Sequence, residues 1–530
     1  MDHTSSQVNA LTGRGDGKAV DWSRILHRIV VAVCALWLIG YFFPPINHDT
    51  AVLLYISKLW INGGTLYIDA IDINTPLVFI VYSLPELLAK LTGLPSPTML
   101  TALLGIGIAG SYLTCRRVLK ASLNPDLAIS AAVLPVLLLF LLIVYPNNMF
   151  SQREHIMLVL TMPYLLVASG RAGASPLSLR LRILTGLLAG LGFAMKPYFL
   201  VVPVLVELYI LYQRGFRYSI RDAAPWSVLA VCVAHALFAV IVTPQYFTFV
   251  IPMARDFYSE LGGVTLYELF INGNFGAPTV ILPLLGIVAF WGVRSHLARV
   301  IFLAGFGGLF SAYAQFKGWS YHILPAQALT LLLAGAVIAA VLDNMAWLKR
   351  GDKRPARIFA AALMLMVFYQ QALNSSPFYM QFGYRNSDTQ RLLEIVKLER
   401  GNGRILILSP GIYPHFPLLN YANLRMTMPF ESMWLLQGVY AECLSDGSLF
   451  HNPRNMNAGE TFVFKTVSES FAAQQPSLLI VDKIAGIPLC GEDEFDYLEY
   501  FLQNPRFAEA FAHYEELVEY DRYAIYRRRD

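Results

Sequence analysis

The sequence predicts a polytopic α-helical membrane protein that ends in a small α/β domain outside the membrane. Of its 530 residues, 56% are hydrophobic and 14% are charged, and the mean hydropathy is +0.50. A soluble globular domain carries roughly 25% charged residues, so a large soluble protein is excluded. Apolar runs close to the ~20 residues of a spanning helix recur up to residue 374, whereas charges are spread throughout residues 376–530.

The predicted spanning segments follow one another closely. Their expected ranges are 28–44, 97–115, 126–145, 154–170, 181–195, 197–213, 223–243, 277–293, 298–315, 322–342 and 356–374. We expect residues 1–27 to form a cytoplasmic tail, 28–375 the transmembrane domain and 376–530 the extracytoplasmic domain. Two short runs meet at Lys196-Pro197, which indicates a tight turn or a broken helix.

The apolar run 76–92 is predicted to lie along the outer membrane surface instead of spanning the bilayer. If it does not span, the cytoplasmic segments before the C-terminal domain carry 20 Lys and Arg residues and the outer segments carry 6. If it spans, every later loop changes side and this positive-inside bias is reversed. Glu86, Lys90 and two prolines within the run also suit a juxtamembrane helix. Eleven spans from a cytoplasmic N-terminus then place the C-terminus outside.

The C-terminal region has the pattern of a small α/β domain. Short strand-like runs occur at 404–409, 477–482 and 523–526, with helical patterns at 388–400 and 493–504 between them. About 150 residues is a normal domain size. Cys443 and Cys490 are the only cysteines of the domain, and a disulfide and two free thiols are equally compatible with the sequence.

Ionisable residues gather at the outer ends of the predicted spans. Such groups cost several kcal/mol at membrane depth, so they usually mark a functional site. In the first outer loop, Asp49 either caps a helix or acts as a general base at the membrane surface. Asp69 and Asp72 are either turn residues or residues that line a pocket or bind a metal, and the second reading is favoured for Asp72.

The second outer loop ends in four consecutive polar residues where the fourth span begins. They are Gln152, Arg153, Glu154 and His155. An acidic residue is favourable at a helix N-terminus, which accounts for Glu154 alone. It does not account for the other three residues, so a functional role is favoured for the group.

Two further cations lie at the outer membrane boundary. Lys196 either extends its ammonium group to the interface or binds a phosphate. Lys317 is followed by Trp319, Tyr321 and His322. Aromatic residues alone are typical of an interfacial belt, but lysine and histidine beside them favour binding of a phosphate or a sugar. The long outer loop 244–276 contains Gly262-Gly263 and is predicted to act as a lid.

The order and sidedness of these motifs resemble the GT-C superfamily of integral-membrane glycosyltransferases. The nearest resemblance is to the bacterial branch related to protein O-mannosyltransferases and to the aminoarabinose transferases that modify lipid A. It rests on Asp49 after the first span, the Gly63-Gly64 break, Asn74-x-Pro76-Leu77, Arg153-Glu154-His155, the Gly-rich run 186–196 ending in Lys196, and Lys-Gly-Trp-x-Tyr-His at 317–322. It covers roughly residues 20–345.

The resemblance implies a glycosyltransferase with a polyprenyl-phosphate-linked sugar as donor. Transfer to a glycolipid, a polysaccharide or a protein would take place on the outer face of a bacterial cytoplasmic membrane, usually with inversion. Asp49 would be the catalytic base, Glu154 would bind acceptor, donor or metal, and the donor phosphate would lie among cations. The implied substrate-binding residues are Arg153, Lys196, Lys317, Gln152, His155, Asp72, Trp319, Tyr321 and His322.

Metal dependence varies among the proteins that the chain resembles. A divalent ion, if used, would be held by Asp49, Glu154 and His155. The chain departs from the usual Asp-Glu first motif, since it has His48-Asp49-Thr50, and its second motif is a glutamate flanked by Arg and His. No other cofactor is expected, and the expected partners are the donor, the acceptor and membrane lipids, without nucleic acid.

Three other functions are compatible with parts of the sequence. A secondary transporter also buries charges, but near the membrane midplane and often within inverted repeats, and this sequence shows no repeat. An oligosaccharide ligase that uses a polyprenyl-diphosphate donor is not distinguished by the motifs. A non-catalytic scaffold would retain its role when Asp49 and Glu154 are both neutralised.

Overall fold

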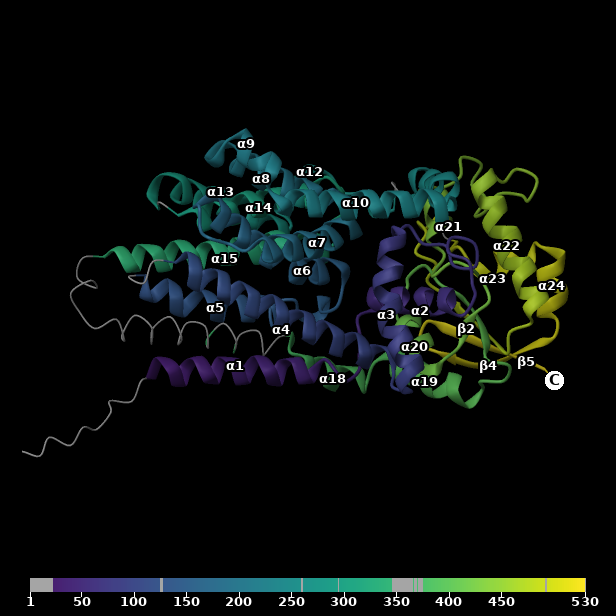
Figure 1. Cartoon of the computed structure of the whole chain (residues 1–530). Coiled ribbons are helices and arrows are strands. Elements are labelled where there is room, and N and C mark those ends of the chain that lie inside the picture. Colours follow the sequence, from purple (N-terminus) through teal and green to yellow (C-terminus); the bar gives the residue numbers. More distant parts are fainter. Residues whose placement is uncertain are drawn as a thin grey trace, which may run out of the picture.

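The protein is a multi-pass membrane protein in which a long helical bundle is joined at one end to a domain that contains a β-sheet (Figure 1). The computed structural model describes residues 22–123, 127–258, 261–293, 295–345, 366, 369, 375–490 and 493–529. The predicted span 356–374 therefore lies almost wholly outside the described residues.

The helices before the C-terminal domain comprise long segments along the bundle and shorter ones at its ends. They are α1 (Trp22–Gly40), α2 (His48–Ile61), α3 (Pro76–Thr92), α4 (Ser96–Ser122), α5 (Ala128–Ile143), α6 (Arg153–Ala172), α7 (Leu179–Met195), α8 (Val201–Arg214), α9 (Phe216–Arg221), α10 (Ala223–Val242), α11 (Ile251–Met253), α12 (Leu266–Ile271), α13 (Gly273–Ile287), α14 (His296–Tyr313) and α15 (Ser320–Asn344). Among the described residues, α4, α6, α10, α14, α15 and the stretch Gly273–Gly292 are long and apolar enough to cross a membrane.

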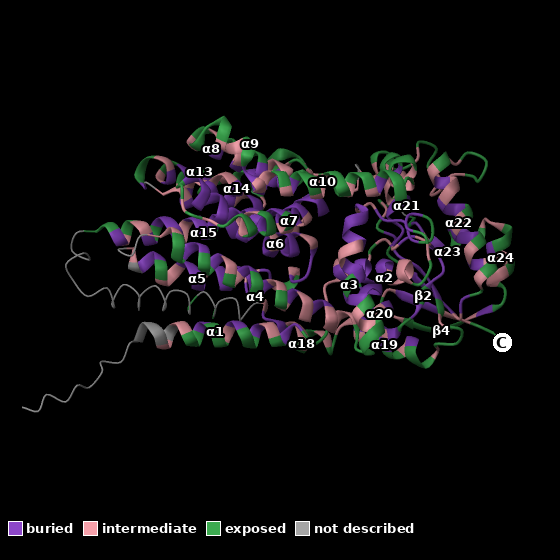
Figure 2. Cartoon of the chain, in the orientation of Figure 1, coloured by how far each residue is buried: buried purple, intermediate pink, exposed green. Residues whose placement is uncertain are grey.

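Burial distinguishes a lipid-facing helix from a central one. Only 11% of the apolar window of α10 is buried, although its mean hydropathy is 2.2. In α6, 94% of the window is buried, and Figure 2 shows this contrast between the two helices. Apolar side chains exposed along a helix are stable only in contact with lipid. The helix that carries the Arg153-Glu154 motif is therefore the most enclosed of these spanning candidates.

The first outer loop folds into two helices that lie between the bundle and the C-terminal domain, as the sequence predicts. In Figure 1, α3 runs across the direction of the long helices, and α2 packs against it. Pro76 begins α3, where a proline costs no helical hydrogen bond, and Gly93 ends it in the left-handed conformation with φ 74°.

The C-terminal domain surrounds a five-stranded sheet in the order β2-β1-β3-β5-β4. β1, β2 and β3 are parallel, and β5 pairs antiparallel with both β3 and β4. The strands are β1 (Arg404–Leu408), β2 (Arg425–Met426), β3 (Leu478–Asp482), β4 (Tyr514–Tyr520) and β5 (Tyr523–Arg528). The helices are α18 (Pro377–Tyr384), α19 (Asp388–Leu398), α20 (His415–Ala422), α21 (Trp434–Val439), α22 (Ala458–Gln474), α23 (Tyr497–Leu502) and α24 (Pro505–Phe511). Cys443 and Cys490 form a disulfide, which selects one of the two alternatives that the sequence leaves open.

Close packing explains the glycine-rich sequence of α7. A Cβ atom at Gly186 would lie 2.5 Å from the carbonyl oxygen of Ala224 at the start of α10. A Cβ atom at Gly192 would lie 2.9 Å from a methyl group of Thr161 on α6. Small residues let helix backbones approach closely in membranes. These glycines therefore hold α7 against α6 and α10 and fix the position of Lys196, which ends the helix.

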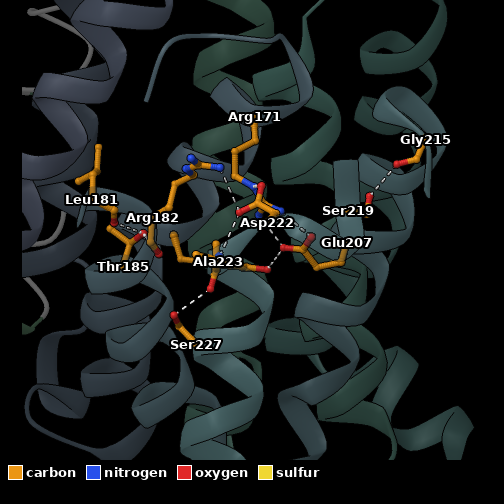
Figure 3. Close-up of polar contacts among 12 residues, drawn as sticks. Arg171, Leu181, Arg182, Thr185, Glu207, Gly215, Ser219, Asp222, Ala223 and Ser227 are labelled. Atoms are coloured by element: carbon orange, nitrogen blue, oxygen red, sulfur yellow. Dashed lines mark hydrogen bonds and ion pairs between the residues drawn. The ribbon is translucent and has the colours of Figure 1, made fainter. Parts of the chain in front are cut away.

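A buried ionic cluster ties three helices together at the end of the bundle away from the sheet domain (Figure 3). Arg171, which is 1% exposed, donates from Nε to Asp222 Oδ2 over 2.7 Å. Its Nη1 and Nη2 donate to Oε1 and Oε2 of Glu207 over 2.6 and 2.8 Å. Tyr164 donates to the same Glu207 from its hydroxyl group. The cluster joins α6, α8 and the N-terminal cap of α10.

Removing the guanidinium group should leave two carboxylates in a poorly solvated place. Breaking a buried ion pair by deleting one partner costs about 3–5 kcal/mol. We therefore expect Arg171→Met to lower the thermal unfolding temperature of the purified protein by several degrees. The control is Arg180→Gln, which replaces an exposed arginine in the first turn of α7 and should leave the unfolding temperature unchanged. Equal unfolding temperatures for the two variants would show that the cluster does not stabilise the bundle.

Candidate active site

A cavity of about 810 Å³ lies where the bundle, the juxtamembrane helices and the C-terminal domain meet. Eight residues that the sequence analysis selected line it: Asp49, Asp72, Arg153, Lys196, Lys317, Trp319, Tyr321 and His322. They come from segments more than 270 residues apart in the chain. Gln152 and Glu154 do not line the cavity; each is buried directly behind a residue that does.

The carboxylate of Asp49 is free to act in the cavity because another residue caps its helix. Asn47 Oδ1 accepts hydrogen bonds from the backbone N–H groups of Asp49 and Thr50 at the start of α2. The capping role considered for Asp49 therefore belongs to Asn47. Asp49 Oδ2 accepts from Gln152 Nε2 over 2.9 Å, and the same Nε2 group lies 2.9 Å from Asn47 Oδ1. Gln152 thus fixes the carboxylate between the two outer loops.

Glu154 and Lys196 form an ion pair at the wall of the cavity. The glutamate side chain is fully buried, and the lysine ammonium group contacts its Oε1 atom at 2.5 Å. Lys196 is the residue at which α7 ends, with an extended backbone (φ −140°, ψ 89°) that turns its side chain out of the helix. In a low-dielectric place a lone ammonium group would be costly. Glu154 is therefore the counter-ion that keeps Lys196 charged in this wall.

The ring of Tyr321 contacts both cations of this wall. Its ring centroid is 5.9 Å from the guanidinium carbon of Arg153 and 5.3 Å from Lys196 Nζ. Arg153 also donates to the side-chain oxygen of Asn74 in the first outer loop. Cations over an aromatic face are attracted to it, so the ring holds two positive charges side by side without neutralising either of them.

Lys317 holds the long outer loop in place. Its ammonium group donates to the backbone carbonyl oxygens of Tyr258, over 3.0 Å, and of Leu261. A backbone bridge between Gly263 and Lys317 strengthens this attachment. Tyr258 and Arg255 of the same loop line the cavity. The loop predicted to act as a lid therefore contributes part of the cavity lining, and Lys317 binds its backbone there.

The three candidate metal ligands do not converge on one point. His155 is buried, with Nδ1 accepting from the backbone N–H of Ser151 and Nε2 at 2.8 Å from the carbonyl oxygen of Leu142. Glu154 is engaged with Lys196. Within the part of the chain that the structure describes, no group of three or more His, Cys, Asp or Glu side chains is arranged to hold a metal ion. The predicted ligand set of Asp49, Glu154 and His155 therefore does not fit a metal ion.

The C-terminal domain completes the cavity with residues that the sequence analysis did not select. Glu431, Trp434 and Gln437 all line it. The backbone places Glu431 opposite Asp72, because the N–H of Ile71 donates to the carbonyl oxygen of Pro429 over 2.8 Å and Ile71 pairs with Phe430. No local motif marks Glu431 in the sequence, since Asp72, the carboxyl group that it faces, lies hundreds of residues earlier in the chain.

Asp72 and Glu431 are two carboxyl groups in one poorly hydrated place. Burial raises the pKa of Asp72, against two hydrogen bonds of 2.6 Å from the backbone and side chain of Asn74, which lower it. Burial and the nearby charge of Asp72 together raise the pKa of Glu431 well above its usual range. Glu431 Oε2 is buried and accepts no hydrogen bond from the described residues. The pair is therefore a polar subsite that favours a proton or a hydrogen-bond donor.

Asp69, in contrast, acts as a turn residue. Its side chain is exposed and accepts from the backbone N–H of Thr65 over 2.7 Å. It does not line the cavity.

Comparison with solved structures identifies the fold. Over 96% of this chain and 98% of the other, the structure is similar to that of ArnT from Cupriavidus metallidurans bound to undecaprenyl phosphate, with a TM-score of 0.57 and 13% sequence identity. It is also similar to the oligosaccharyltransferase of Archaeoglobus fulgidus tethered to an acceptor peptide, over 93% of this chain and 72% of the other, with a TM-score of 0.50 and 12% identity. No protein-family model and no curated protein sequence matches the chain. The chain thus has the GT-C fold that its motifs predict.

The carboxyl pair leads to a test of stability against pH. Because the pKa of Glu431 is raised in the folded protein, folding becomes less favourable as the pH rises above the ordinary carboxyl pKa of about 4.3. Glu431→Gln removes this penalty, so its unfolding temperature should rise relative to wild type between pH 5 and pH 8. The exposed Glu442→Gln is the control and should follow wild type. A pH-independent difference for Glu431→Gln would contradict the raised pKa.

Proposed function

We propose that the protein is a membrane glycosyltransferase that moves a sugar from a polyprenyl-phosphate donor to an acceptor on the outer face of a bacterial cytoplasmic membrane. The observation that carries the proposal is the cavity itself, which Arg153, Lys196 and the carboxylate of Asp49 line together. Support comes from the GT-C fold, which this chain shares with an ArnT structure that contains undecaprenyl phosphate.

The cations would hold the donor phosphate and stabilise the leaving group. When the bond between the anomeric carbon and the phosphate oxygen breaks, negative charge develops on the polyprenyl phosphate. Preorganised positive charges at that position lower the barrier because they need no reorganisation during the reaction. Arg153 and Lys196 meet this requirement, since the Tyr321 ring and Glu154 fix them in advance.

Asp49 would act as the general base. The acceptor hydroxyl or amine gives its proton to the Asp49 carboxylate as its oxygen or nitrogen forms the new bond to the anomeric carbon. Attack from the side opposite to the phosphate inverts the anomeric centre. Gln152 and Asn47 orient the carboxylate in this scheme, and Glu154 acts through Lys196 as a positioning residue.

The proposal also covers the orientation of the protein in the membrane, the transferred sugar and the acceptor. The positive-inside bias of the sequence supports an N-terminus in the cytoplasm and a C-terminal domain in the periplasm. The transferred group would be a hexose or a pentose, and the acceptor a glycolipid, a polysaccharide or a protein. A polyprenyl-diphosphate oligosaccharide is the alternative donor, and secondary transport is the alternative function. An assay of purified protein in lipid, with a panel of polyprenyl-phosphate and polyprenyl-diphosphate sugars, separates these possibilities by the donor that is consumed.

The proposed role of Asp49 as the general base is tested by comparing two aspartate substitutions in the first outer loop. We expect Asp49→Asn to reduce transfer by at least about 100-fold, the lower end of the contribution of a general base. Asp69→Asn removes an exposed carboxylate from the same loop and should retain the wild-type rate. Both variants should unfold at the wild-type temperature. Normal turnover by folded Asp49→Asn would reject the assignment.

The ion pair is tested by a double-mutant cycle. Lys196→Met and Glu154→Gln should each raise the KM for the donor, because the first removes a phosphate ligand and the second removes the counter-ion that keeps this ligand charged. If Glu154 acts only through Lys196, the double variant should be no worse than Lys196→Met alone. An additional loss in the double variant would instead mean that Glu154 contacts the substrate itself.

A further inference from the structure

A second cavity, of about 1040 Å³, lies on the other side of α2 from the candidate active site. His48, Asp49 and Val52 of α2 line the first cavity, whereas Tyr55 and Lys58 line the second. The two cavities share no lining residue. The second cavity is bounded by α2, α3, the start of α4, and the α19, α20 and β2 region of the C-terminal domain.

Positive charge predominates around this cavity. Lys58 and Lys90 reach it from the juxtamembrane helices, and Lys397 and Arg425 reach it from the C-terminal domain. Glu86 is the one acidic residue among its lining residues. Within the described ranges, none of the four cations forms a salt bridge with a carboxylate. The site therefore has an excess of positive charge that a bound anion would neutralise.

The hydrogen-bond acceptors of the two lysines are neutral, and Glu86 is the one lining carboxyl group whose charge acts on Lys58. Lys58 Nζ donates to Asn423 Oδ1 over 2.5 Å, and Lys90 Nζ donates to Asn62 Oδ1 over 3.1 Å. Side-chain amides are neutral acceptors. They orient the two ammonium groups without cancelling their charge, and each ammonium group retains two further N–H donors.

An apolar rim places the cavity at the membrane boundary. Phe42 and Phe43 follow the last residue of α1 closely, and Leu94 precedes α4. All three line the cavity, and their side chains are 37%, 55% and 49% exposed. They lie at the ends of α1 and α4 that face the C-terminal domain (Figure 1). Cations beside exposed aromatic and aliphatic side chains at this depth match the headgroup region of a bilayer.

We propose that this second cavity binds the phosphate group of an anionic membrane lipid. The phosphate lies between the lysines of the juxtamembrane helices and the cations of the C-terminal domain, and the acyl chains lie against Phe42, Phe43 and Leu94. Because the cations come from both parts of the protein, the bound phosphate draws the domain toward the membrane surface. This inference does not depend on the proposed transferase activity.

Lipid binding to the full-length protein in a neutral detergent tests the site. Native mass spectrometry would compare short-chain phosphatidylglycerol, phosphatidylcholine and inorganic phosphate. Wild type should bind phosphatidylglycerol most tightly, and the double substitution Lys58→Gln plus Lys90→Gln should weaken this binding by about tenfold or more. The double substitution Lys397→Gln plus Arg425→Gln, on the C-terminal domain side of the cavity, should weaken phosphatidylglycerol binding equally. It serves as an independent test if the first double variant does not fold.

The matched control removes two exposed cations from the C-terminal domain far from this cavity. Lys465→Gln plus Arg454→Gln changes the net charge equally and should leave phosphatidylglycerol binding unchanged. Equal weakening by the control would overturn the site in favour of general charge attraction. Equal affinity for phosphatidylcholine would overturn the role of the phosphate charge. Inorganic phosphate that binds as tightly as the lipid would overturn the role of the apolar rim.

Discussion

The buried ion pair between Glu154 and Lys196 is the interaction on which the site depends. A charged lysine at the end of a spanning helix requires a counter-ion, and Glu154 in the first turn of the enclosed helix α6 supplies it. That requirement fixes α7 against α6, and the glycines of α7 permit the contact. Arg153, the residue before Glu154 on α6, contacts the same Tyr321 ring as Lys196. One ion pair thus sets the position of two cations and the shape of one wall.

The C-terminal domain is a structural part of this cavity and not an appendage to it. Glu431 and Trp434 line the cavity, and the backbone of Ile71 pairs with the segment that carries Glu431. The ring of Trp434 also lies 5.8 Å from that of Tyr258 in the outer loop that Lys317 fastens. Three segments therefore close the cavity together. The carboxyl groups of Asp72 and Glu431 and the cations Arg153 and Lys196 all line this cavity.

Sequence patterns could predict the fold and the site residues of the membrane domain, because both depend on features of short stretches of sequence. Membrane spans are long apolar runs, the juxtamembrane position of α3 follows from charge bias, and strands such as β1 and β3 are short apolar runs. Arg153, Lys196 and Asp49 stand out because charge at a membrane boundary is costly wherever it occurs. Glu431 lies in a domain with many charged residues, so the sequence does not distinguish it from other glutamates. Only the tertiary pairing of Ile71 with Phe430 shows that Glu431 lies beside Asp72 in the cavity. The roles of Glu154 and Lys317 were also beyond local patterns, because each depends on a partner at least forty residues away.

Helix α2 contributes residues to two cavities of different charge. Its first turn presents Asp49 to a cavity that both carboxylates and cations line, and Lys58, nine residues later, faces a cavity where cations predominate. A 14-residue helix that is buried along much of its length moves as a rigid unit. A lipid phosphate that binds Lys58, as proposed above, would act on the same helix that carries the Asp49 carboxylate, to which Gln152 donates a hydrogen bond.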